Sequence, residues 1–367
     1  MKILYVITKS SEGGAQTHIM QLTRAMIAQG HQVAVMSAPR GWLQQAVVSL
    51  GGIFFPNEYF RNSYNPLLAL RIRRKLREAI SEFQPDLISC HSGFAGFMTR
   101  LIVRNRVPTL FTAHGWSFSP GSPRLQRTVS LAAELLAARW CEKIICVSEF
   151  DRQLGISRGI ASPEKLITIR NGVELPDNPP PIRTSLRRAV FVGRLVGQKR
   201  PLDVLQAVAL LPQEIRAALQ ISFIGDGPLQ PMLQEYAERH QLTPYLHFYG
   251  NIHRDRVLEL LRLNDLFLLP TNHEGLPRSI IEALSLGLPV LSSAVAGVPE
   301  LIQDTVGYLL TPGNEAAELA QHIVELYEHP ELLSAMSSNA YRRAKEHFSI
   351  ERTIGQTMDV YREIVND

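Results

Sequence analysis

Short runs of β-branched and other apolar residues alternate along the chain with longer stretches in which apolar residues recur every three or four positions. The short runs are typical of buried strands, and the longer stretches are typical of amphipathic helices. Strands and helices that alternate in this way predict parallel sheets with helices on both faces. The runs that predict strands are Lys2–Ile7, Val33–Met36, Asp86–Cys90, Thr109–Thr112, Lys143–Val147 and Leu166–Ile169 in the first half, and Ala189–Val192, Gln220–Ile224, Leu246–Tyr249, Asp265–Leu269 and Pro289–Ser292 in the second.

A proline-rich segment separates the two halves. Residues 177–185 read Asp-Asn-Pro-Pro-Pro-Ile-Arg-Thr-Ser, and consecutive prolines fit neither a helix interior nor a central strand. We therefore expect an α/β protein with two doubly wound, Rossmann-like domains, over residues 1–178 and 179–349. A chain of 367 residues is long enough to give both a full-sized core. Ligands of such folds bind beyond the carboxyl ends of the strands, which predicts a central cleft as the site.

The composition is that of an ordinary soluble globular protein, with 45% hydrophobic and 20% charged residues. No apolar run approaches the roughly 18 residues that span a bilayer, and the N-terminal run lacks the cleavage pattern of a signal peptide. The three cysteines lie in apolar segments without metal-ligand spacing, which favours reduced core thiols and a cytoplasmic location. These cysteines are Cys90, Cys141 and Cys146.

Two glutamates, Glu274 and Glu282, follow the apolar run that ends at Leu269. Pro277 suits the first turn of a helix, so Glu274 is expected in the loop before that helix and Glu282 one to two turns inside it. Backbone N–H groups at a helix N-terminus attract anions, while carboxylates accept hydrogen bonds from sugar hydroxyls. This combination suits a nucleotide sugar, although acidic residues also occur in first helical turns simply as caps.

Three other strand ends carry glycine beside polar residues. Gly13 and Gly14 follow the first strand and allow a backbone to approach a ligand closely. Gly193 ends the first strand of the second half, and Arg194 and Lys199 follow it as cations that can neutralise a leaving diphosphate. Gly225 ends the next strand with a turn. Each of these also fits an ordinary solvated loop.

In the first half, His114 lies just past a strand and precedes Gly115, which allows a tight turn. This places the histidine at the expected edge of the cleft, although a lone histidine is more often structural. The sequence has no Gly-x-Gly-x-x-Gly fingerprint, no Walker loop, no zinc spacing and no Gly-x-Ser-x-Gly elbow. These absences weigh against a nicotinamide oxidoreductase, a P-loop enzyme, a zinc enzyme and a serine hydrolase.

Taken together, these motifs resemble those of the retaining nucleotide-sugar glycosyltransferases of family 4, which have the two-domain GT-B fold. The resemblance spans nearly the whole chain. Its motifs are Gly13-Gly14, Ala113-His114-Gly115, Asn171-Gly172-Val173, Gly193-Arg194-Leu195 with Lys199, Gly225-Asp226-Gly227-Pro228, Glu274 through Glu282, and Gly297-Val298-Pro299-Glu300.

The resemblance implies a role for each matching residue. Arg194 and Lys199 hold the donor diphosphate, and His114 and Glu274 contact the donor sugar. Glu282 binds the nucleotide ribose. The full set implied to bind the donor is Gly13, Gly14, Gly193, Gly225, Gly275, Leu276, Pro277, Arg278 and Glu282, beside the catalytic residues His114, Arg194, Lys199 and Glu274. The resemblance also implies that the enzyme needs no metal or cofactor, that a UDP-sugar is the first donor to test, and that a terminal helix over 350–367 packs back on the first domain.

The Gly-Leu-Pro-Arg-Ser that follows Glu274 resembles the form found in enzymes that build capsular, extracellular or lipopolysaccharide chains, whereas many family members have Phe-Gly here. The implied acceptor is therefore a glycan or lipid-linked hydroxyl, and the implied mechanism is front-side attack with retention. Three alternatives stay open from the residues alone. They are a nucleotide-sugar epimerase or hydrolase of the same architecture, a binding module that senses a nucleotide sugar, and a nicotinamide oxidoreductase.

Charge is distributed unevenly. Residues 1–180 contain 21 Lys and Arg against 12 Asp and Glu, whereas residues 181–367 contain 17 against 22. Residues 66–83 predict an amphipathic helix with Ile72, Leu76 and Phe83 on one face and five cations on the other. Such a helix either covers the sheet or contacts an anionic membrane. The second interpretation predicts a peripheral location on the inner face of the cytoplasmic membrane, and no nucleic-acid motif accompanies the basic half.

Overall fold

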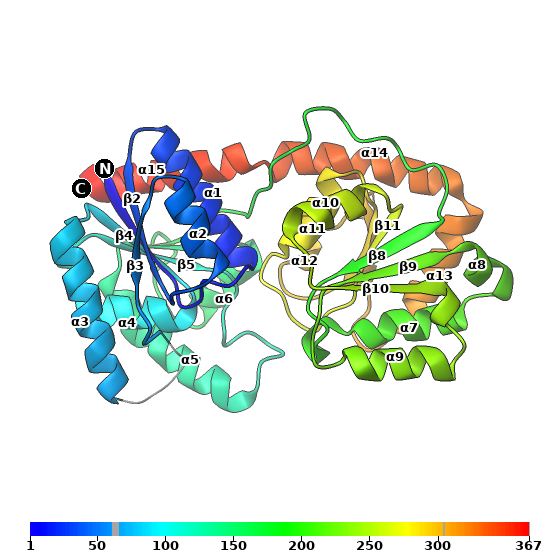
Figure 1. Cartoon of the computed structure of the whole chain (residues 1–367), viewed down its shortest axis with the longest axis horizontal. Coiled ribbons are helices and arrows are strands. Elements are labelled where there is room, and N and C mark those ends of the chain that lie inside the picture. The colour runs from blue at the N-terminus through cyan, green and yellow to red at the C-terminus, as the bar shows by residue number, and fades with distance from the viewer. Residues whose placement is uncertain (61–65, 304, 367) are drawn as a thin grey trace. The chain divides into compact units, whose positions relative to one another are not determined.

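The computed structural model describes residues 1–60, 66–303 and 305–366, which form two compact units. The first unit contains residues 1–171 together with the C-terminal segment that begins at Ile350, and the second contains residues 172–349. Each unit is built on one parallel sheet flanked by helices (Figure 1). The predicted α/β class with two doubly wound parallel sheets is therefore confirmed.

The sheet of the first unit has the strand order β3-β2-β1-β4-β5-β6-β7. Its strands are β1 (Lys2–Val6), β2 (Gln32–Ser37), β3 (Ile53–Pro56), β4 (Leu87–His91), β5 (Thr109–Ala113), β6 (Lys143–Cys146) and β7 (Leu166–Thr168). The helices are α1 (Gly14–Ala28), α2 (Trp42–Ser49), α3 (Pro66–Phe83), α4 (Gly93–Val103), α5 (Arg124–Ala137), α6 (Glu149–Ser157) and α15 (Ile350–Asn366).

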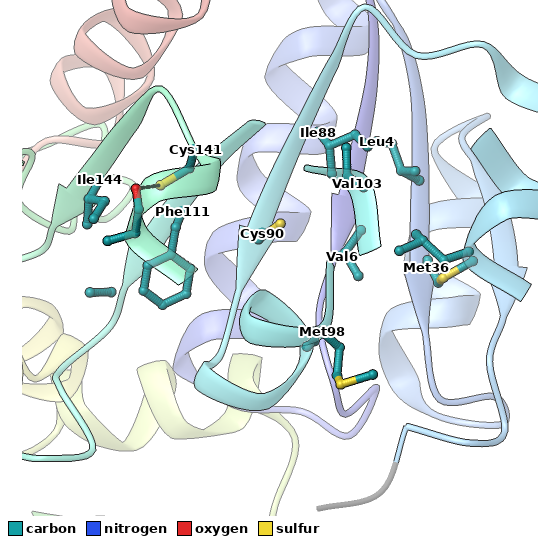
Figure 2. Close-up of a cluster of buried hydrophobic side chains, with 14 of the residues drawn as sticks. Leu4, Val6, Met36, Ile88, Cys90, Met98, Val103, Phe111, Cys141 and Ile144 are labelled. Carbon is teal, nitrogen blue, oxygen red and sulfur yellow. Dashed lines mark hydrogen bonds between the residues drawn. The ribbon is translucent and has the colours of Figure 1, made fainter. Parts of the chain in front are cut away.

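Successive side chains of β1 enter two different cores, because side chains alternate between the faces of a sheet. Leu4 and Val6 join a cluster with residues of α3, α4, β4 and β5 (Figure 2). Ile3 and Tyr5 join the cluster on the opposite face, to which α1 and α15 contribute. In Figure 1 the red helix α15 lies beside the blue N-terminal elements, so the last residues of the chain complete the core that its first residues begin.

The three cysteines are free and buried, which confirms them as core thiols. Cys90 and Cys141 belong to the cluster that Figure 2 shows. Burial raises the pKa of the Cys90 thiol to about 12, so this side chain is a neutral core group at physiological pH.

The sheet of the second unit has the order β10-β9-β8-β11-β12-β13. Its strands are β8 (Arg188–Val192), β9 (Gln220–Ile224), β10 (Leu246–Gly250), β11 (Leu266–Leu269), β12 (Val290–Ser293) and β13 (Gly307–Leu310). The helices are α7 (Pro201–Leu210), α8 (Gln213–Ala218), α9 (Gln230–Arg239), α10 (Arg254–Arg262), α11 (Arg278–Ser285), α12 (Val298–Leu301), α13 (Glu315–Glu328) and α14 (Pro330–His347).

The division between the units falls between residues 171 and 172, rather than between 178 and 179. Two hydrogen bonds fasten the intervening segment to the second unit. The Val173 amide donates to the carbonyl of Phe348 at 2.9 Å, and the Arg183 amide donates to Ser337 Oγ at 3.0 Å. The prolines of this segment therefore lie on the surface of the second unit, where they need no strand partner.

Helix α3 has the bounds that its hydrophobic period predicts. Ile72, Leu76 and Phe83 are buried, whereas Arg73, Arg74 and Arg77, here called the arginine face, are exposed. The helix therefore covers the sheet, and its exposed side carries the charge that a membrane contact would use. None of the helices in the described part of the chain is both long enough and apolar enough to span a bilayer.

The strand order reverses between β1 and β4 in the first sheet and between β8 and β11 in the second. At such a switch point the loops that leave the two neighbouring strands turn to opposite faces of the sheet, which leaves a crevice at the carboxyl edge. In each unit, the loops of this edge are therefore where a ligand site is expected.

Candidate functional site

At the switch point of the second unit, the loop after β8 lies against the loop after β11. The backbone N–H of Asn272 donates to the backbone carbonyl of Gln198 at 2.8 Å, and Gln198 Nε2 donates to the backbone carbonyl of His273 at 2.7 Å. Thr271 Oγ1 lies 3.1 Å from the same Gln198 carbonyl oxygen. These bonds hold the two loops in a fixed register, so the functional side chains that they carry have fixed positions.

Lys199 and Glu274, one from each loop, form an ion pair between Nζ and Oε1. Their side chains are only 15% and 10% exposed, and Thr271 Oγ1 is within 3.0 Å of the same carboxylate oxygen. The sequence placed both residues at strand ends, and the structure brings them into contact. The pair leaves neither charge unpartnered in a nearly closed site, where an unpaired charge is costly.

Glu282 lies inside α11, whose first residue is Arg278, with Pro277 one position earlier as the N-cap. Glu282 Oε1 pairs with Arg254 Nη2 at 2.8 Å, and the two side chains are 11% and 21% exposed. Arg254 is the first residue of α10, just after β10 ends. The predicted placement of Glu282 within the helix is confirmed, and Arg254 is its partner.

The segment from Gly275 to Arg278 is buried throughout. Arg278 Nη1 donates to the carbonyl of Gly172 at 2.9 Å, and burial lowers the pKa of this guanidinium to about 10, so it stays charged at neutral pH. Leu276 is 3% exposed. Arg278 therefore ties the start of α11 to the segment that opens the second unit.

Gly225 is required by the backbone itself. Its φ is 127°, and a Cβ at this position would lie 2.2 Å from the carbonyl oxygen of Gly193. A Cβ on Gly193 would meet only ordinary contacts, of which the closest are at 3.6 Å on Phe191. Gly225 therefore lets the turn after β9 pack on the turn after β8, whereas Gly193 has room for a Cβ.

Arg194 is exposed, and its side chain makes no ion pair or hydrogen bond with any described residue. Lys199, in contrast, is held by Glu274. The loop after β8 therefore offers one cation in solvent, Arg194, and two that are already paired, Lys199 with Glu274 and Arg200 with Asp203 and Glu315. It lies at the edge of the sheet where an anion is expected to bind.

In the first unit, Gly13 precedes α1 as its N-cap and Gly14 is the first helical residue. Gly13 has an extended backbone that other residues adopt readily. A Cβ on Gly13 would meet only the end of the flexible Gln16 side chain, at 2.8 Å from Oε1. The folded loop therefore does not itself demand glycine here.

His114 follows β5 and turns at Gly115, whose φ is 114°. His114 Nε2 is 3.0 Å from His91 Nδ1, and His91 is the last residue of the neighbouring strand β4. The rings of His114 and His91 stack with centroids 5.3 Å apart, and the ring of His18 on α1 meets His114 edge-on at 5.2 Å.

In the described ranges, these three histidines are the one group whose ligand atoms lie close enough to share a metal ion, within 4.8 Å of one another. Two of the three are joined directly by the hydrogen bond between His91 Nδ1 and His114 Nε2. Burial and the proximity of His114 hold the pKa of His91 well below its usual value, so that His91 is neutral.

Sequence reasoning located His114, Arg194, Lys199, Glu274 and Glu282 correctly at strand ends or helix starts, but it missed their partners. The missed residues are His18, His91, Arg254 and Thr271. Three of the four lie at or just beyond the carboxyl end of a strand, so a search for polar residues at every such position would have found them. The structure groups the predicted residues into two sets, one at the switch point of each unit.

Chemically, the set in the second unit combines cations with carboxylates on one edge of a sheet. Cations bind phosphate oxygens, and carboxylates accept hydrogen bonds from hydroxyls. A ligand with both a diphosphate and several hydroxyls would use all of them. When such a ligand binds, Lys199 would pair with the diphosphate and Glu274 would bind the hydroxyls, in place of the ion pair between the two residues.

Two family models match the chain in succession. Residues 12–176 match the model described as Glycosyltransferase Family 4, and residues 177–343 match the model described as Glycosyl transferases group 1. The boundary between the two models lies within a few residues of the division between the structural units. Together the models cover residues 12–343, which include every strand of the two sheets except β1 and all seven motifs of the resemblance.

Curated relatives and solved structures agree with these models. The chain is 28% identical over 301 residues to the UDP-Gal:alpha-D-GlcNAc-diphosphoundecaprenol alpha-1,3-galactosyltransferase of Escherichia coli, covering 76% of each chain. It is also 28% identical over 320 residues to the O-antigen biosynthesis glycosyltransferase WbnH of Escherichia coli, covering 83% of this chain and 88% of that protein. The crystal structure of Anabaena Alr3699/HepE in complex with UDP-glucose superposes with a TM-score of 0.84 at 21% identity, covering 99% of this chain and 100% of that one.

Proposed function

Because the chain is a glycosyltransferase of the family 4 type with the GT-B fold, we propose that it transfers a sugar from a UDP-sugar to a hydroxyl of a glycan or lipid-linked acceptor. In this proposal the transfer retains the configuration of the sugar and serves the synthesis of a cell-surface polysaccharide. The observation that carries this proposal is the ion pair between Lys199 and Glu274 at the switch point of the second unit.

When the donor binds, its diphosphate replaces Glu274 as the partner of Lys199. The freed carboxylate then accepts hydrogen bonds from hydroxyls of the donor sugar. Arg194, exposed on the same loop, supplies a second positive charge to the diphosphate. As the bond to the sugar breaks, negative charge grows on the diphosphate, and preorganised cations stabilise that charge most.

Glu282 binds the ribose in this proposal. Its carboxylate accepts one hydrogen bond from Arg254 through Oε1, and a carboxylate has lone pairs for further donors. Two adjacent ribose hydroxyls suit such an acceptor. Arg254 meanwhile holds the carboxylate in place, so the ribose meets a group that is already oriented. In the first unit, His114 donates a hydrogen bond to the donor sugar.

The choice of UDP and of a lipid-linked acceptor draws on the relatives. The crystal structure of Alr3699/HepE contains UDP-glucose, and the name of the Escherichia coli galactosyltransferase specifies UDP-Gal and a diphosphoundecaprenol-linked acceptor. An acceptor anchored in a membrane would favour an enzyme that reaches the surface of that membrane. The arginine face of α3 provides a charge for this contact, at about 1 kcal/mol per cation near an anionic surface.

The experiment is a screen of nucleotide sugars for UDP release, with and without a polyprenyl-diphosphate-linked sugar, in buffer that contains EDTA. We expect one UDP-sugar to be turned over only in the presence of the acceptor, without added metal, and to give an α-linked product from an α-linked donor in the NMR spectrum. Inversion of the anomeric centre would contradict retention, and a requirement for Mg²⁺ or Mn²⁺ would contradict metal independence.

The same screen separates the alternatives. Release of UDP at equal rates with and without any acceptor would indicate a hydrolase or epimerase. Tight binding of UDP-sugars without turnover, with glycan as well as with lipid-linked acceptors, would indicate a binding module. Either result would overturn the transferase proposal.

A further inference from the structure

Four polar side chains form a continuous series of hydrogen bonds through the core of the first unit. The hydroxyl of Tyr361 donates to Ser89 Oγ at 3.1 Å, and Ser89 Oγ lies 3.1 Å from His91 Nε2. His91 Nδ1 in turn lies 3.0 Å from His114 Nε2. We call these four residues the buried relay, because only His114, at its end, is partly exposed.

The fold explains how residues far apart in the sequence meet here. Ser89 and His91 are two positions apart on β4, so they face the same side of the sheet as the core that includes Tyr361 of α15. Strand β5 pairs with β4, with Thr112 opposite His91, so His114 leaves β5 next to the end of β4. The relay therefore connects the C-terminal helix to a residue implied to contact the donor.

The direction of the hydrogen bonds assigns a proton to each ring nitrogen. Burial raises the pKa of Tyr361 to about 12, so its hydroxyl keeps its single proton. The hydroxyl lies 3.1 Å from Ser89 Oγ and 3.5 Å from the Tyr5 hydroxyl, and we place the proton on the shorter contact, toward Ser89. The hydroxyl proton of Ser89 is then free to point at His91 Nε2. A neutral histidine carries one ring proton, and with Nε2 as acceptor this proton sits on Nδ1.

The same reasoning carries the assignment to His114. His91 Nδ1 donates to His114 Nε2, so the proton of His114 sits on its own Nδ1. Burial keeps His91 neutral, as the lowered pKa of its ring indicates, and a neutral ring has one donor and one acceptor for the two bonds that it makes. Every donor in the buried relay therefore points from Tyr361 toward His114.

We propose that His91 is a positioning residue for the transfer reaction, because it fixes the ring orientation and the tautomer of His114 so that His114 presents an N–H to the donor sugar. The inference rests on the proposed role of His114. Ser89 and Tyr361 act one and two steps further back by fixing the tautomer of His91. His18, edge-on against His114, restrains the ring from the side of α1.

The first test reads the tautomers directly, by NMR of protein labelled with ¹⁵N-histidine, and needs no activity. In the unaltered protein we expect the ring protons of both His91 and His114 on Nδ1. His91→Phe keeps a ring but removes both nitrogens, so His114 should change to the Nε2–H form that predominates for histidine in water. His91→Asn retains an N–H at the level of Nδ1 and should leave His114 unchanged. If His114 has the same tautomer in all three proteins, the inference is overturned.

The second test measures turnover in the same variants, with the thermal unfolding midpoint as the control for folding. We expect His91→Phe to lower kcat by about 10- to 100-fold, as loss of orientation does, with the affinity for UDP unchanged. His91→Asn should restore most of this loss. If His91→Phe does not fold, Tyr361→Phe takes its place, because it removes one hydroxyl only. The expected result is then a partial shift of the His91 tautomer with a smaller fall in kcat.

His114→Ala separates this inference from the proposed function. If His114→Ala is inactive while His91→Phe and Tyr361→Phe turn over like the unaltered enzyme, the positioning role of His91 is wrong and the role of His114 stands. If His114→Ala is fully active, the role proposed for His114 is wrong, and the tautomer measurement still decides whether the buried relay sets the proton of this ring.

Discussion

Replacement of Lys199 by alanine tests the central ion pair most sharply, because it should affect stability and turnover together. The substitution leaves Glu274 as a carboxylate whose side chain is 10% exposed, with Thr271 Oγ1 as the one remaining hydrogen-bond partner in the described structure. A hydrogen bond to a charged group contributes about 1.5–3 kcal/mol. We therefore expect the free energy of unfolding to fall by about this amount. For a unit of this size, this corresponds to a fall of about 2–4 °C in Tm for each kcal/mol.

Turnover should fall by about 10²–10³-fold in the same variant, which is the cost of removing one preorganised group that stabilises developing charge. Arg194→Ala is the matched control. Arg194 is an exposed cation on the same loop without an ion pair to a described residue, so its loss should change stability by less than about 0.5 kcal/mol. Its effect on turnover should nevertheless resemble that of Lys199→Ala.

The assays are urea unfolding followed by circular dichroism and the rate of UDP release at saturating donor. A double variant, Lys199→Ala with Glu274→Gln, completes the design. The neutral amide no longer leaves an uncompensated charge, so part of the lost stability should return while turnover stays low. An unfolding midpoint of Lys199→Ala equal to that of the unaltered protein would refute the role of the pair in stability. Near-normal turnover of Lys199→Ala would refute its role at the leaving group.

The remaining predictions concern binding, the glycines and the membrane. Glu282→Ala should weaken UDP binding in calorimetry by about 1.5–3 kcal/mol, whereas Glu274→Ala should leave it almost unchanged, and equal losses would contradict the division between ribose and sugar. Gly13→Ala should keep the native Tm but raise KM for the donor. Gly225→Ala should instead lower Tm, because Gly225 has a positive φ and its Cβ would lie 2.2 Å from a carbonyl oxygen. The opposite pattern would contradict the role of Gly13 in donor binding. The unaltered protein should sediment with anionic but not with neutral liposomes, and reversal of the arginine face of α3 to glutamate should abolish this sedimentation. Binding that is absent, or that survives both this change and high salt, would leave α3 as a covering helix only.

Most strands were predictable because both faces of these sheets are buried, which makes each central strand a continuous apolar run. The two strands that the pattern missed are both at sheet edges. Strand β3 includes Pro56, and its Ile53 is 47% exposed. Strand β13 begins at Gly307, where a Cβ would lie 1.9 Å from the carbonyl oxygen of Val290, so glycine is needed for close packing on β12. The edge strands β7 and β10 were predicted, so the two misses come from the local constraints at Pro56 and Gly307 rather than from the edge position alone.

The residues of the site were predictable because the carboxyl ends of parallel strands lie on one edge, and charged residues there have few other uses. The pairs between them were not. Lys199 and Glu274 are 75 positions apart, and they meet only because β11 enters the sheet beside β8. The contact of His91 with His114 likewise depends on β4 and β5 being neighbours. Strand order is set by how whole helices pack, which a pattern along one segment does not contain.

The docking of α15 has a consequence for the order in which the protein is made. Tyr361 and Ile364 belong to the core that Ile3 and Tyr5 begin, yet residues 172–349 must be translated between them. At about 5–20 residues per second, this takes on the order of 10–35 s. During that time the first 171 residues emerge from the ribosome without α15, which is one of the helices that cover this face of their sheet. The second unit, whose residues are contiguous, can therefore complete its fold before the first. We expect a chaperone to bind the nascent chain at the apolar surface that α15 later covers.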